Sequence, residues 1–94
     1  YPRAVRELEN LLPDYEDLPP VWHELAELRG LAGDTGGVHT ARAEYFILNG
    51  ELDKARQQLT YALNFYRDNR SQSARVQKRL QDITEMESNK LLDG

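Results

Sequence analysis

Apolar residues recur along most of the chain at the three- and four-residue spacing of an amphipathic helix, and not at the alternating spacing of a strand. In one segment, Leu52, Ala55 and Leu59 fall on the same helical face. Glycine and proline clusters separate such segments, because proline lacks a backbone donor and glycine leaves φ unrestricted. We therefore expect an all-α fold of five helices, over residues 1–12, 20–32, 38–48, 52–66 and 73–90.

The predicted breaks lie at residues 12–18, 33–37, 49–50 and 68–71. Pro20 is well suited to the first position of the second helix. Asp34 or Thr35 is available to cap the third helix. The glycine-rich stretch 33–37 lacks both a lysine and a preceding strand, so it is predicted to be a helix–helix turn and not a phosphate-binding loop.

Two of the predicted helices carry a second apolar line. Ala43, Phe46 and Ile47 form it in the third helix, and Tyr61 and Phe65 form it in the fourth. A helix that is apolar on two sides is expected to be covered on two sides. The last helix has one narrow apolar stripe, as the end of a stacked array requires, and is predicted to be a capping helix.

Length and composition limit the possible functions. The 94 residues suffice for one small domain. No cysteine is present, which excludes disulfides and cysteine-ligated metals, and two histidines leave little material for any other metal site. No apolar run is long enough to span a membrane. The chain has neither an initiating methionine nor a signal peptide, so we expect it to be a fragment of a longer array.

Charge is distributed unevenly. Residues 1–50 contain 4 basic and 9 acidic residues, whereas residues 51–94 contain 8 basic and 7 acidic residues. The acidic first half of the chain would repel nucleic acid, which is therefore disfavoured as a partner. Within the second half a basic cluster could dock an acidic surface, although a solvated helix face is the favoured explanation. The cluster consists of Arg67, Arg70, Arg75, Lys78 and Arg79.

Three segments resemble the tetratricopeptide repeat, a pair of antiparallel helices of about 34 residues. The opening of a first helix is matched by Trp22, Leu25 and Ala26, with Gly33 as the turn glycine, and Trp22 is expected to be largely buried. A nearly complete repeat is matched by Ala43, Phe46, Gly50, Leu52, Ala55, Leu59 and Ala62. This register implies that Ala43 and Ala55 are buried at close helix–helix contacts. The second helix of an earlier repeat is matched by Ala4, Leu8 and Leu11, so the chain is expected to open halfway through a repeat.

This resemblance implies a single domain over residues 1–94, with a truncated repeat at 1–12, degenerate repeats at 20–66 and the capping helix at 73–90. The two first-helix motifs, at Ala26 and Ala43, are only 17 residues apart, which is half a repeat. The helix at 38–48 is therefore expected to pack against both of its neighbours. Arg29, His39 and Arg42 depart from the repeat pattern.

A narrower resemblance is to the C-terminal repeat region of bacterial M48-family zinc metallopeptidases, of the kind that assists β-barrel assembly. It is carried by the blocks 22–27, 41–46, 49–55, 72–76 and 79–80. The resemblance implies a protein-binding part of a periplasmic protease in outer-membrane protein quality control, with zinc held only by the parent's catalytic domain. Its expected partners are that domain, an unfolded outer-membrane protein or the assembly machinery. The alternative is a tetratricopeptide scaffold from a parent that is not a protease.

No catalytic or metal site is expected in this segment. His23-Glu24-Leu25-Ala26-Glu27 begins like the H-E-x-x-H motif of zinc proteases, but glutamate stands where the second histidine should be. We therefore expect a binding module that has no enzymatic activity, no cofactor and no inserted membrane segment.

The repeat resemblance also implies a set of partner-binding residues on the first helices, outside the packing motif. The set comprises His23, Glu27, Gly30, Thr40, Glu44 and Ile47. Stacking should bring these residues onto one surface, and its two carboxylates should favour ligands that carry lysine or arginine. The basic cluster is expected to dock on a different face.

Overall fold

The computed structural model describes the backbone of residues 1–93 and the side chains of residues 1–89. Over these residues the chain is all-α, and it contains no strand. The five helices are α1 (Pro2–Tyr15), α2 (Pro19–Leu31), α3 (Thr35–Leu48), α4 (Leu52–Phe65) and α5 (Arg70–Asp93). The five helices predicted from apolar spacing are confirmed.

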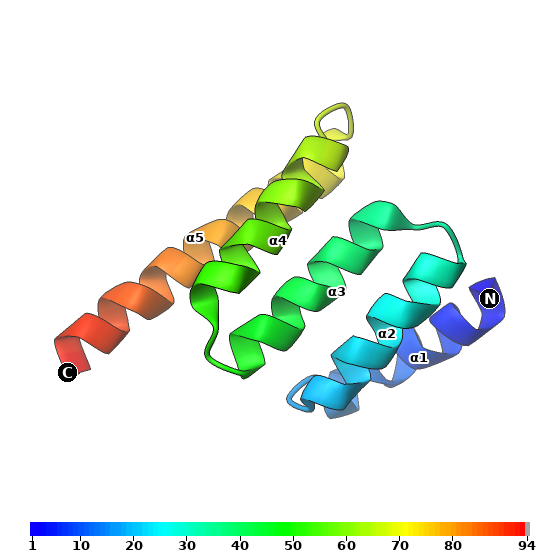
Figure 1. Ribbon diagram of the computed structural model, residues 1–94, viewed down its shortest axis with the longest axis horizontal. Coiled ribbons are helices and arrows are strands. Elements are labelled where there is room, and N and C mark those ends of the chain that lie inside the picture. The colour runs from blue at the N-terminus through cyan, green and yellow to red at the C-terminus, as the bar shows by residue number, and fades with distance from the viewer. Residues whose placement is uncertain (94) are drawn as a thin grey trace.

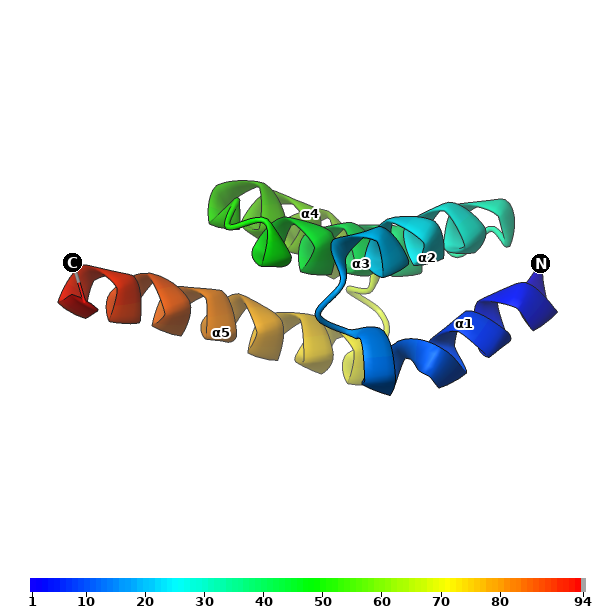
Figure 2. The ribbon, with the colours of Figure 1, turned by 90° about the horizontal axis from the view of Figure 1, so that it is seen from below.

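The helices form two layers (Figures 1 and 2). In one layer α2, α3 and α4 lie side by side, each antiparallel to the next, with α3 packed against both neighbours. In the other layer α1 lies under α2, and α5 lies under α4 (Figure 2). The expectation that the third helix is shared by its two neighbours is therefore confirmed. No described helix is both long and apolar enough to cross a membrane.

Two turns use glycine for its conformational freedom. Gly33 and Gly50 have φ angles of 80° and 77°, in the left-handed region that favours glycine. They end α2 and α3 as the sequence predicts. Asp34 then caps α3, because its Oδ1 accepts a hydrogen bond of 3.0 Å from the backbone N–H of Gly37.

Gly36 and Gly37 do not belong to the predicted break, because α3 already begins at Thr35. Both are buried and serve close packing. A Cβ at Gly36 would lie 2.2 Å from Cζ of Tyr66, and one at Gly37 would lie 2.2 Å from Oδ2 of Asp34. The absence of a side chain, and not a special φ, is what these two positions require.

Two other predicted boundaries are wrong by several residues. Pro13 lies inside α1, which continues to Tyr15, so it does not open the linker. The helix α5 begins at Arg70, three residues before the prediction, because Asn69 caps it: its Oδ1 accepts a 3.1 Å hydrogen bond from the N–H of Gln72.

The core consists of two clusters that meet on α3. The larger cluster joins α3, α4 and α5 through Ala43, Ala55, Leu59, Ala62, Val76 and Ile83. The smaller cluster joins α2 and α3 through Leu25, Ala26 and Ala41, with Val5, Leu8, Leu12 and Trp22 packed against it. The prediction that Ala43 and Ala55 are buried is confirmed, since both are fully inaccessible.

One burial prediction needs correction. Tyr61 and Phe65 remain 44 % and 55 % exposed, so the second apolar line of α4 is not fully covered. The helix packs against α3 and α5 through its alanine and leucine face. Tyr61 lies at the edge of the contact with α3, where its ring is 5.4 Å from that of His39. Trp22 is mostly buried, as predicted, and its indole N–H donates a 2.8 Å hydrogen bond to the carbonyl oxygen of Glu16 in the α1–α2 turn.

Candidate binding groove

A groove of about 420 Å³ lies along α3, and residues of α1 and α5 are among those that line it. All five helices or their immediate ends contribute to it. Its lining residues are Glu9, Trp22, Arg29, Asp34, Gly37, Thr40, Glu44, Leu59, Tyr66, Gln72, Arg75, Val76 and Arg79. The groove thus exists only when the whole helical stack is assembled.

The floor of the groove is held by Arg29, whose side chain is only 16 % exposed. Its Nη1 donates hydrogen bonds to the carbonyl oxygen of Gly37 at 3.1 Å and to Oγ1 of Thr40 at 3.4 Å. Its Nη2 lies 3.9 Å from a carboxylate oxygen of Glu9 on α1. One guanidinium group therefore links α1, α2 and α3 beneath the groove.

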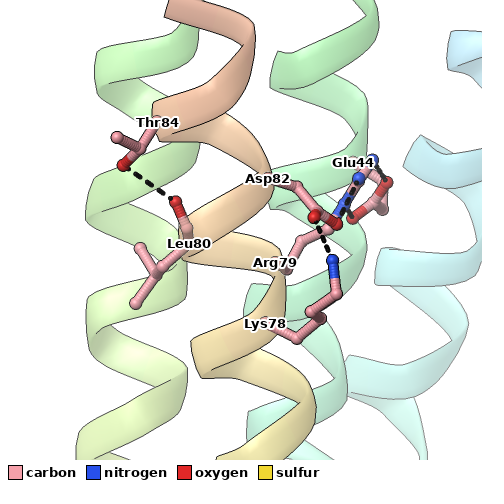
Figure 3. A network of polar contacts seen from close by, with 6 residues as sticks. All are labelled: Glu44, Lys78, Arg79, Leu80, Asp82 and Thr84. Carbon is pink, nitrogen blue, oxygen red and sulfur yellow. Dashed lines mark hydrogen bonds and ion pairs between the residues drawn. The ribbon is translucent and has the colours of Figure 1, made fainter.

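The wall formed by α5 is fixed by an ion pair between Arg79 and Glu44 of α3 (Figure 3). Nε and Nη2 of the arginine donate to the two carboxylate oxygens at 2.8 and 2.7 Å, the fork geometry that makes such pairs strong. Nη1 donates to Asp82 at 3.2 Å. The hydrogen bond to Glu44 is the main cause that raises the pKa of Arg79.

Lys78 lies next to this pair but is directed to Asp82 (Figure 3). The hydrogen bond between the ammonium group and the carboxylate raises the pKa of Lys78 and lowers the pKa of Asp82. Two of the five members of the basic cluster, Lys78 and Arg79, thus already have carboxylate partners within the chain.

Arg75 lies one helical turn before Arg79 on the same wall of the groove. Its side chain is exposed, and among the residues whose side chains are described it has no hydrogen-bond or ion-pair partner. The neighbouring Gln72 is half-buried and also lines the groove. The part of the α5 wall nearest the start of the helix therefore presents polar groups that are open to a ligand.

The end of the groove near the α4–α5 turn is formed by Tyr66. Its ring lies against the backbone of Gly36, where no side chain could fit. Burial is the main cause that raises the pKa of the phenol, and the negative charge of Asp34 adds to it, while Arg29 acts in the opposite direction. The phenol consequently remains neutral and is able to donate a hydrogen bond over the physiological pH range.

The predicted partner-binding residues do not all line this groove. Thr40 and Glu44 do, whereas His23, Glu27, Gly30 and Ile47 are not among the lining residues. Ile47 packs against the larger core cluster, and the ring of His23 lies 5.9 Å from that of Tyr45. Whether any of the six contacts a partner stays a prediction.

The basic cluster is divided by the structure. Arg75 and Arg79 line the groove, whereas Arg67 and Arg70 line a separate hollow of about 440 Å³ at the α4–α5 turn. The two predicted sets are not fully separate, since Arg79 and Glu44, one from each set, bind each other. Where either set docks a partner stays a prediction. The two are 35 residues apart in sequence, so no local spacing indicates the contact.

Sequence reasoning also missed the role of Arg29, which appeared only as a departure from the repeat pattern. Arg29 stands where the repeat pattern has an aromatic packing residue. Because a charge at a core-facing position needs a partner, this substitution could have indicated that Arg29 pairs within the fold. Among the side chains that the structure describes, no three His, Asp or Glu residues come together as a metal site would require.

Comparison with models of known protein families, with curated proteins and with solved structures found no match for this chain.

Proposed function

We propose that this domain binds a segment of another protein in the groove between α1 and α5. The observation that carries the proposal is that residues from all five helices converge on one groove, whose α5 wall is fixed to α3 by the two-point ion pair of Arg79 and Glu44. Preformed walls reduce the entropy lost when a ligand binds. Trp22 and Tyr66 supply aromatic surface in the same groove, and aromatic residues are favoured at protein interfaces.

We further propose that the domain belongs to a periplasmic M48-type metalloprotease and presents substrates or assembly partners to it. Support comes from the residue blocks that resemble the repeat region of that family and from the helical-hairpin architecture. The alternative is a scaffold domain from a parent that is not a protease. An upstream H-E-x-x-H helix in the encoding gene would favour the first assignment, and another upstream domain would favour the second.

Chemical-shift mapping tests the binding proposal. The ¹⁵N-labelled domain would be titrated with an unfolded segment of an outer-membrane β-barrel protein and, separately, with an isolated M48 protease domain. We expect shifts at groove residues, foremost Trp22, Thr40 and Arg75. Shifts confined to the outer face, around His23 and Tyr61, would contradict the proposal.

Two glutamines of α5 provide a matched pair of variants. Gln72 lines the groove, whereas Gln77 lines the separate hollow. Gln72→Tyr should fill part of the groove and weaken binding, and Gln77→Tyr should leave binding unchanged. Equal effects of the two variants would show that the groove is not the binding surface.

A further inference from the structure

The groups that line the groove and are charged at neutral pH are three arginines and three carboxylates, so the formal charge is balanced. Their availability is not balanced. Glu44 is occupied by the two-point contact with Arg79, and Asp34 accepts the hydrogen bond that caps α3. Glu9 lies 3.9 Å from the guanidinium of Arg29.

Arg75 is the exception. It is exposed in the groove and has no partner among the described side chains. The adjacent Gln72 amide and the Tyr66 hydroxyl add further hydrogen-bond donors to the same groove, and the pKa of that hydroxyl is raised. A ligand carboxylate would therefore find a cation that has no partner among the described side chains. A ligand cation would have to compete with Arg79 for Glu44, with Arg29 for Glu9, or with the backbone N–H of Gly37 for Asp34.

We infer that the groove selects an acidic peptide segment, whose carboxylate pairs with Arg75 and whose apolar side chain lies beside Trp22. This inference rests on the proposed protein-binding function and reverses the charge preference expected from Glu27 and Glu44 in the sequence. Glu44 is neutralised within the chain, and Glu27 does not line the groove. The charge complementarity is thus set by Arg75, the groove cation that has no partner among the side chains that the structure describes.

The test uses two synthetic peptides without tryptophan that share the same apolar residues. One carries glutamate and the other lysine at matching positions. Binding is followed by the fluorescence of Trp22, the only tryptophan of the chain. We expect the acidic peptide to bind about fivefold more tightly than the lysine peptide, which is the upper end of what a solvent-accessible ion pair contributes to affinity. The difference in affinity should shrink as salt is added.

Two arginine variants sharpen the result. Arg75→Glu should remove or invert the preference. Arg67→Glu should retain it, because Arg67 is equally exposed but lines the hollow outside the groove. Circular dichroism would verify that both variants keep their helical content.

Equal affinity for the two peptides, a preference for the lysine peptide, or equal effects of the two variants would overturn the inference. Binding of neither peptide would also overturn it. In that case the shift mapping described above separates the two proposals: shifts at groove residues would retain the binding function and discard only the acidic preference, and their absence would discard both.

Discussion

The two helices of the outer layer are attached to the stack in different ways. Helix α5 places Val76 and Ile83 in the core and adds the two-point ion pair from Arg79 to α3. Helix α1 has no fully buried residue, and its ionic link across the groove, from Glu9 to Arg29, has a separation of 3.9 Å. The groove therefore has one firmly held wall and one weakly held wall.

This difference predicts where the domain is stable and where it opens first. Elements with few buried apolar contacts open locally at a lower free energy than the core does. Helix α1 also leaves Leu11 and Tyr15 about half exposed, so little apolar area holds it in place. We expect α1 to detach from the stack without unfolding α3, α4 and α5.

The largest effect is expected from core truncations in the two outer helices. Ile83→Ala removes a fully buried side chain of α5 and should cost about 2–5 kcal/mol of unfolding free energy. Leu8→Ala removes a half-buried side chain of α1 and should cost only about 1 kcal/mol. Urea denaturation of both variants gives these values, and equal losses would mean that the two walls are held equally well.

Enlarging an alanine should distinguish the same two regions. Ala55 is fully buried on α4, so Ala55→Leu should overpack the larger cluster and lower stability by about 1–3 kcal/mol. Ala4 is exposed on α1, and Ala4→Leu should change stability by no more than about 0.5 kcal/mol. Thermal melts measure the change in stability of both variants. An unchanged melting temperature for Ala55→Leu would contradict the packing assigned to α4.

The ion pairs of the two walls allow a smaller comparison. Arg79→Met should lower the free energy of unfolding by about 1–2 kcal/mol. This loss lies between those typical of an exposed ion pair and of a hydrogen bond to a charged group, because Arg79 and Glu44 are both mostly buried. Glu9→Gln should lower it by less than about 0.5 kcal/mol, since its contact is long and its side chain is nearly half exposed. Denaturation at low and high salt would give both values, and a larger loss for Glu9→Gln would reverse the assignment of the walls.

The smallest effect concerns pH. Because folding raises the pKa of Tyr66, its protonated form is favoured in the folded state, and the resulting stabilisation is present below the unfolded pKa of 10.0. That stabilisation is lost as the pH rises through the folded pKa. Tyr66→Phe should therefore lose less stability than the parent between pH 8 and pH 11. Parallel losses in urea denaturation would show that the phenol titrates as it does in the unfolded chain.

The sequence was sufficient to predict the helices and most of the core, because these depend on local spacing. Leu25, Ala43 and Ala55 follow directly from the apolar pattern and are buried. Gly36 was misassigned to a turn because a glycine that admits a neighbouring ring and a glycine that ends a helix are identical in sequence.

The groove was harder to predict, because it depends on contacts between distant residues. Thr40 and Glu44 were identified as candidate residues, but the pairing of Glu44 with Arg79 was not. That contact changes the charge available to a ligand. The predicted preference for basic ligands rested on Glu44, which the fold pairs with Arg79, and on Glu27, which does not line the groove. Side-chain pairing across the stack, and not residue type, determines the charge of the groove.

Intermolecular nuclear Overhauser effects between the domain and the bound acidic peptide test the central claim most directly. The claim is that the groove between α1 and α5 is the binding surface. We predict contacts from the peptide to the indole of Trp22, the ring of Tyr66 and the side chain of Arg75, which all line that groove. Contacts only to residues outside the groove, such as Tyr45 or Tyr61, would contradict it.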